Sequence, residues 1–139
     1  MKKLLILALI AFTTFNAFSQ NLQKGNLVGL HTVTVKLNAK TTMDQLVDFM
    51  SNKWSAAESK FYSCDAKLLK YVRGGTVGAD KLTFLIIYKD AASRNKFYNP
   101  DGTTNEGGKA AEAKMKSITD EFNKLASIVK NEYTDWEVK

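Results

Sequence analysis

The alternation of apolar and polar positions predicts four short strands. From Leu27 to Leu37 the side chains alternate and include several β-branched residues, which is the pattern of a strand. Residues 64–73 predict a second strand. Residues 82–88 are apolar at almost every position, which predicts a third strand with both faces covered. Residues 133–138 predict a fourth strand that ends the chain.

Apolar residues spaced three and four apart predict two amphipathic helices. The first begins at a capping box formed by Thr42 and Gln45. The second runs to about Lys130 and begins at a similar capping box over residues 103–106, followed by two glycines. Between them, Asp90 can cap a short helix over residues 91–98 that leads into a turn. The two apolar stripes are Met43, Leu46, Val47, Met50, Trp54, Ala57 and Phe61 in the first helix, and Ala111, Met115, Ile118, Phe122, Leu125 and Val129 in the second.

The predicted order of elements is β-α-β-β-α-β, with a turn interrupting the second helical unit. This order predicts an α+β, ferredoxin-like fold in which a four-stranded antiparallel sheet carries its helices on one face. Residues 20–139 show no repeat and no linker, so they are predicted to form a single domain.

The predicted sheet carries apolar side chains on both faces, and its helix-free face needs a cover. Leu85 and Ile87 oppose Phe84 and Ile86 in the third strand, and Val28 and Leu30 oppose Val33 and Val35 in the first. Large apolar patches are rare on soluble monomers. A second copy related by a two-fold axis is the simplest cover, so the sequence predicts a homodimer with a shared, sheet-lined interior.

The N-terminus has the three parts of a signal peptide. Two lysines precede an apolar run too short to span a bilayer, and Ala17-Phe18-Ser19 forms a small-x-small cleavage site. We therefore expect residues 1–19 to be removed and the mature protein to be exported, to the periplasm or outside the cell, with no membrane anchor left. Removal lowers the net charge from +6 to +4. The remaining lysines are scattered and only two arginines are present, which argues against a nucleic-acid partner.

Cys64 is the single cysteine, so the chain has no internal disulfide, and we interpret this residue as a small buried apolar group. One cysteine and one histidine cannot supply the usual ligand set of a structural zinc site, and no metal site is predicted. The glycine-rich segment 74–78 leads into a strand rather than a helix, which favours a hairpin loop over a phosphate-binding loop.

His31, the single histidine, is the candidate catalytic residue, either as a general base or as a haem ligand. The alternative is a half-buried strand residue hydrogen-bonded to a neighbour, on the same face as Val33 and Val35. Gly29 is placed to host a β-bulge that would re-aim the imidazole. The candidate ligand-binding residues are the aromatic side chains of Trp54, Tyr71, Tyr88 and Trp136, with Arg73 as a partner for an anionic group.

Several segments together resemble the dimeric α+β barrel superfamily, which includes antibiotic-biosynthesis monooxygenases and the EthD-like and NIPSNAP-like proteins. The resemblance is carried by residues 29–35, the capped helix from Thr42, the glycine loop and residues 97–102. It implies a dimeric barrel. It also implies a range of activities: cofactor-free oxygenases, haem-dependent or haem-degrading enzymes, and isomerases.

Three functions remain open from the sequence. The protein holds a small apolar or aromatic molecule in the barrel interior, or it is a monooxygenase or isomerase that uses His31, or it is a structural dimer with a filled interior. The first is favoured because the chain offers much apolar surface and few catalytic groups.

Overall fold

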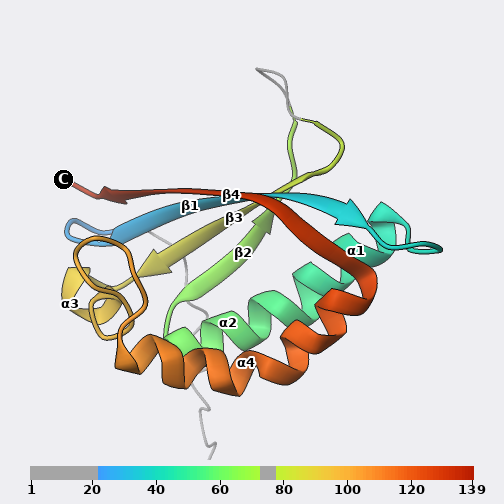
Figure 1. Cartoon of the computed structure of the whole chain (residues 1–139). Helices are drawn as coiled ribbons and strands as arrows, with labels where there is room; N and C mark the ends of the chain where they lie inside the picture. The colour runs from blue at the N-terminus through green and yellow to red at the C-terminus, as the bar shows by residue number, and fades with distance from the viewer. Residues whose placement is uncertain (1–21, 73–77) are drawn as a thin grey trace, which may run out of the picture.

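The computed structural model describes residues 22–72 and 78–139 (Figure 1). The predicted signal peptide, most of the glycine loop and the candidate residue Arg73 lie outside the described residues. None of the helices in the described segments is long and apolar enough to cross a membrane.

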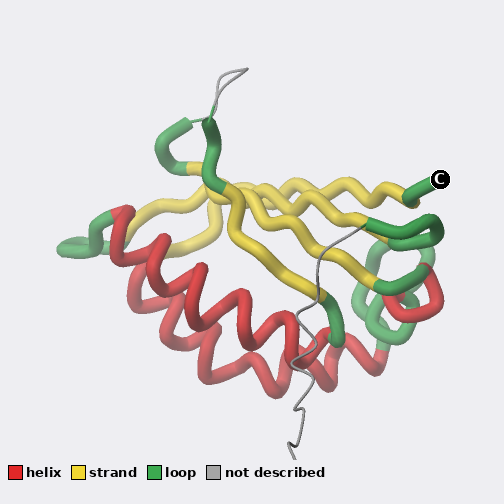
Figure 2. The backbone as a smooth tube through the Cα atoms, turned by 180° about the vertical axis from the view of Figure 1, so that it is seen from behind, coloured by secondary structure: helices red, strands yellow, loops and turns green. Residues whose placement is uncertain are grey.

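Four strands form one antiparallel sheet. They are β1 (Leu27–Leu37), β2 (Asp65–Leu69), β3 (Lys81–Tyr88) and β4 (Ala126–Glu137), and they lie side by side in the order β2-β3-β1-β4. The helices α1 (Met43–Phe49), α2 (Ser55–Tyr62) and α4 (Glu106–Leu125) cover one face of this sheet, as Figure 1 and the reverse view in Figure 2 both show. The predicted ferredoxin-like α+β fold is confirmed.

The hydrophobic core lies between the sheet and the helices. Val33 and Val35 of β1, Leu82 and Phe84 of β3, and Leu46 of α1 are all buried there. His31 pairs with Phe84 and therefore shares their face. The histidine thus lies on the helix side of the sheet.

The first predicted helix begins as expected but is not uniform. The Thr42 hydroxyl accepts a hydrogen bond from the Gln45 N–H and the Gln45 side chain accepts one from the Thr42 N–H, which confirms the capping box. Between α1 and α2 the chain forms a π-helical segment, η1 (Met50–Trp54). Each extra residue in a turn rotates the next part of the helix by about 100°. As a result, α2 buries Ser55 and Tyr62 most deeply rather than the predicted Ala57 and Phe61.

The last helix is shorter than predicted and the last strand is longer. α4 ends at Leu125 and β4 begins at Ala126, so Val129 and Lys130 are strand residues rather than helical ones. Residues 126–128 pair with the end of β1, and the β-branched pair Ile128-Val129 suits a strand better than another helical turn. The second predicted capping box is also wrong, because Asn105 is the N-cap and accepts from the Gly108 N–H.

Three further predictions need correction. The second strand ends at Leu69, the last residue of β2 that pairs with β3, and not at Arg73. The short helix α3 covers Ala91–Arg94 rather than 91–98, although Asp90 caps it as predicted. The β-bulge lies between Thr34 and Val35 and not at Gly29, whose pairing is regular. The bulge forms there because β4 carries an extra residue opposite that step.

Gly108 is required by close approach and not by flexibility. A Cβ at this position would lie 2.3 Å from the Phe97 carbonyl oxygen and 2.4 Å from Thr104 Cγ2. We expect Gly108→Ala to lower the free energy of unfolding by about 1–3 kcal/mol, because this overpacking outweighs the gain of up to about 1 kcal/mol in helix propensity. Urea unfolding measures this change in free energy. The control Ala110→Gly, at an exposed site of α4, measures the effect of helix propensity alone. A more stable Gly108→Ala protein would contradict the prediction.

Candidate functional site

Two half-open cavities meet between the sheet and the helices. The larger has a volume of about 510 Å³ and lies against α2 and α4, and the smaller, about 270 Å³, lies against β1, β3 and β4. His31 and Tyr98 line both cavities, so the two form one continuous candidate site. The larger cavity is also lined by Trp54, Glu58, Tyr62, Glu112, Ala113, Met115, Lys116 and Thr119, and the smaller by Gly29, Leu30, Ile86, Tyr88, Arg94, Gly102, Thr104, Asn131, Tyr133 and Asp135.

Tyr98 forms a fixed wall of this site. Its ring stacks on Tyr62 with the centroids 5.9 Å apart, and the Arg94 guanidinium lies 5.0 Å from its ring centre. A β-bridge joins Tyr98 to Thr104 and closes the loop that carries it. Gly102 allows this closure, because its φ of +86° and a Tyr133 hydroxyl 2.7 Å from the Cβ position both exclude a side chain.

Arg94 ties this loop to the far edge of the sheet. Its guanidinium donates to the Asn99 carbonyl at 2.7 Å and pairs with the Asp135 carboxylate of β4 at 3.3 Å. The Asp135 carboxylate reaches this position across Gly29, where an added Cβ would lie 3.1 Å from Asp135 Oδ1. Gly29 therefore makes room for this ion pair, which is its role in place of the predicted bulge.

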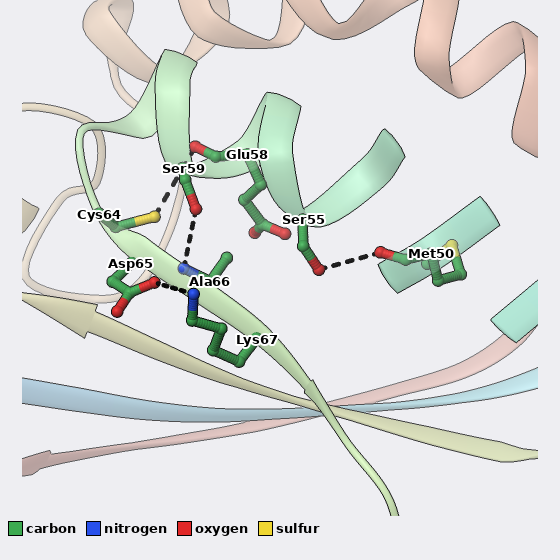
Figure 3. A network of polar contacts seen from close by, with 8 residues as sticks. All are labelled: Met50, Ser55, Glu58, Ser59, Cys64, Asp65, Ala66 and Lys67. Carbon is green, nitrogen blue, oxygen red and sulfur yellow. Dashed lines mark hydrogen bonds and ion pairs between the residues drawn. The ribbon is translucent and has the colours of Figure 1, made fainter. Parts of the chain in front are cut away.

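The inner face of α2 contributes polar side chains (Figure 3). The Ser55 hydroxyl donates to the Met50 carbonyl, and the Ser59 hydroxyl accepts from the Ala66 N–H, which fastens α2 to the start of β2. On the same face the Glu58 carboxylate is turned from the helix toward the sheet (Figure 3). Trp54 Nε1 donates to Glu58 Oε2 at 3.0 Å.

Burial changes the protonation of Glu58. It raises the pKa of this carboxyl from 4.5 to about 7, against the opposing effect of the Trp54 hydrogen bond. A carboxyl that is close to half-ionised at neutral pH, inside an aromatic cavity, is a group that can both accept and return a proton.

The neighbouring hydroxyl and thiol groups stay protonated. Burial raises the pKa of Tyr62 to about 12, and it raises that of Tyr98 well above its usual value, with the nearby Tyr62 and Glu58 adding to the shift. Burial likewise raises the pKa of Tyr88, and it raises the pKa of Cys64 to about 12. Tyr62 and Tyr98 therefore keep their hydroxyl protons at neutral pH and are hydrogen-bonded to each other, and the half-buried Cys64 thiol stays protonated as well.

His31 sits where the two cavities meet. Its Nε2 is hydrogen-bonded to Asn131 Oδ1, an acceptor, so Nε2 carries the proton and donates it. Burial lowers the pKa of His31, opposed by this hydrogen bond and by Asp135, so the imidazole is neutral at pH 7 with its lone pair on Nδ1. The engaged Nε2 does not fit an axial haem ligand. The catalytic role of His31 stays a prediction.

The structure separates the residues predicted to bind a ligand. Trp54 and Tyr88 line the cavities together with His31, whereas Trp136 lies on the helix-free face, 63% exposed, and Tyr71 lies beyond the end of β2. Glu58, Tyr62 and Tyr98 also line the cavities but were not predicted from the sequence. No group of three or more His, Cys, Asp or Glu side chains in the described segments is arranged to hold a metal ion.

Comparison with solved structures identifies the fold. A NIPSNAP family protein from Agrobacterium tumefaciens aligns with a TM-score of 0.50 at 12% identity, over 80% of this chain and 90% of that one. A NIPSNAP domain protein from Burkholderia xenovorans aligns with a TM-score of 0.51 at 11% identity, over 81% and 94%. The chain shares the fold of these two proteins. No protein-family model and no curated protein sequence matches the chain.

The NIPSNAP likeness agrees with the resemblance found in the sequence. Identities of 11% and 12% establish a shared fold and carry no activity with them. Any function of this chain therefore rests on the chemistry of its own cavity.

Proposed function

We propose that this protein binds a small, largely apolar or aromatic molecule in the cavity between the sheet and the helices. The observation that carries the proposal is the continuous half-open cavity, which has aromatic walls at Trp54, Tyr62 and Tyr98 and a few polar groups converging on it. Ligand sites in proteins have this composition, with apolar walls for affinity and a few polar groups for orientation.

The proposed site is inside one chain rather than between two sheets. The Tyr98 ring is held by its stacking on Tyr62 and its contact with Arg94, so this cavity wall is already formed before a ligand enters. Such preorganisation lowers the entropy cost of binding.

Blocking the larger cavity tests this proposal. Ala113 lines that cavity from an exposed position of α4, so a bulky side chain fits there without entering the core. We expect Ala113→Trp to weaken the binding of an aromatic probe, phenylacetone, at least tenfold in a calorimetric or NMR titration. The matched variant Ala110→Trp, exposed on the same helix and outside the cavity lining, should bind as the wild type does. Equal affinities in both variants would contradict the proposal.

We also propose that two copies associate through the helix-free face. Leu30 of β1 lies on this face with Leu85 of β3, and Trp136 of β4 pairs with Val28 beside them. Leu30 is 37% exposed and Trp136 63% exposed, at positions that a monomer would leave in water. A two-fold related copy would cover them.

Export remains a proposal supported by the N-terminal sequence. We expect the mature chain to begin near Gln20 in the periplasm or the medium. Mass measurement of the protein recovered from those fractions tests it, and a full-length mass would contradict it.

A further inference from the structure

We propose that Glu58 is a catalytic base that removes a proton from the carbon next to a carbonyl group of the bound molecule, so that this cavity interconverts keto and enol forms of small aromatic ketones. The inference rests on the proposed binding function and adds a reaction to it. It concerns Glu58 and not His31.

The position of Glu58 suits proton abstraction. Its carboxylate lines the larger cavity and is turned toward the sheet (Figure 3). Trp54 Nε1 donates a hydrogen bond to Glu58 Oε2. Among the described residues, no donor is hydrogen-bonded to Glu58 Oε1. One oxygen is thus fixed by the protein and the other is available to a ligand, as a base on a rigid element requires.

The groups that face Glu58 do not neutralise its charge. Tyr62 and Cys64 come from α2 and its C-terminal end, Tyr88 from β3, Tyr98 from the loop after α3, and His31 from β1. The phenols, the thiol and the imidazole are uncharged at neutral pH. From α4, Glu112 adds negative charge, and the Lys116 ammonium is held at the surface by Asp120 at 2.7 Å. A carboxylate without a buried cation beside it is a stronger base than one in water.

The same cavity supplies a hydrogen-bond donor for the carbonyl oxygen, on which negative charge develops during the reaction. When Glu58 takes the proton, the electron pair of the C–H bond forms the C=C bond, and the carbonyl π pair moves to oxygen. Tyr62 and Tyr98 both stay protonated and share one hydrogen bond, so the pair keeps one hydroxyl proton that can be donated to this oxygen. Return of the proton from Glu58 to oxygen gives the enol, an isomer of the ketone, so the reaction needs no oxidant and no cofactor.

Hydrogen–deuterium exchange at the benzylic carbon of phenylacetone in D₂O tests this inference. We expect the protein to accelerate the exchange, with a rate that rises through about pH 7 as Glu58 ionises. Glu58→Gln should lower the protein-dependent rate by about 100-fold or more, the range typical of general-base catalysis. The control Glu121→Gln, at a surface ion pair between α4 and Lys53 of η1 and outside the lining of both cavities, should leave the rate unchanged.

A second variant separates catalysis from structural support. The Trp54 hydrogen bond lowers the pKa of Glu58, so Trp54→Phe should move the pH–rate profile to higher pH. A profile that does not move would contradict the inference, as would an exchange rate that Glu58→Gln leaves unchanged.

The binding measurement distinguishes the two proposals. Phenylacetone that binds in the cavity without accelerated exchange would overturn the catalytic inference and leave the binding function standing. Phenylacetone that does not bind would overturn both.

Discussion

We expect Leu30→Lys to convert a dimeric protein into a monomer. Leu30 lies on the helix-free face in β1, one of the two inner strands of the sheet, with Leu85 and Thr134 as its cross-strand neighbours. In a lone subunit the lysine ammonium would stay in water, so the fold should tolerate it. In the proposed dimer each subunit would bury one such charge on its helix-free face, and burial of an unpaired charge costs several kcal/mol. Sedimentation at micromolar concentration measures the result.

A matched variant distinguishes loss of the interface from a general effect of charge. Leu22→Lys makes the same change at a 51% exposed residue that precedes β1 and lies outside the sheet, and it should remain dimeric. A wild-type protein that sediments as a monomer at high concentration would contradict the dimer, and a dimeric Leu30→Lys protein would place the interface elsewhere.

We expect Glu58→Gln to stabilise the protein in alkaline solution. The pKa of Glu58 is about 7 in the folded chain and 4.5 when unperturbed, so between these values the folded state holds a proton that the unfolded state has released. The stabilisation from Glu58 is therefore complete below about pH 4.5 and is lost as the pH rises through 7. Glutamine cannot ionise, so the variant should be more stable than the wild type at pH 8 by about 3 kcal/mol, from 1.36 kcal/mol per pKa unit.

The test of this prediction is how the difference in unfolding free energy between wild type and Glu58→Gln changes with pH. The unfolding free energies of wild type and Glu58→Gln should agree near pH 4 and separate above pH 6, as urea unfolding at several pH values would show. Subtracting one curve from the other removes the contribution of His31, which titrates in both proteins. Glu121→Gln, at an exposed ion pair, should change stability by less than about 1 kcal/mol at every pH. If the unfolding free energies of wild type and Glu58→Gln differed by the same amount at every pH, this would contradict the burial of the Glu58 carboxyl.

Local patterns of the sequence predicted most of the fold. The capping box at Thr42, the alternation in β1 and the cap at Asp90 each depend on neighbours a few residues away, and all three are present. The end of α4 was misjudged because the helical spacing continues through Val129. Pairing with β1 competes with that spacing, and such pairing is a long-range contact that periodicity does not contain.

The candidate site was harder to predict for a geometric reason. The apolar stripe of the first helix assumes a uniform helical period, and the π-helical turn at Met50–Trp54 changes that period before α2 begins. Glu58 is then turned toward the sheet although it lies outside the stripe. Tyr98 and Tyr62 meet only through the tertiary fold, 36 residues apart in the chain. His31, Trp54 and Tyr88 were named from their residue types, and the sequence did not show that they line adjoining cavities.

A crystal structure of the protein with phenylacetone bound is the decisive test of the cavity as a ligand site. We expect the probe to lie on the helix side of the sheet, between Trp54, Tyr62 and Tyr98, with its carbonyl group near a tyrosine hydroxyl. A probe bound instead against Leu85 and Trp136 on the helix-free face, with the cavity unchanged, would contradict the binding function proposed for this cavity.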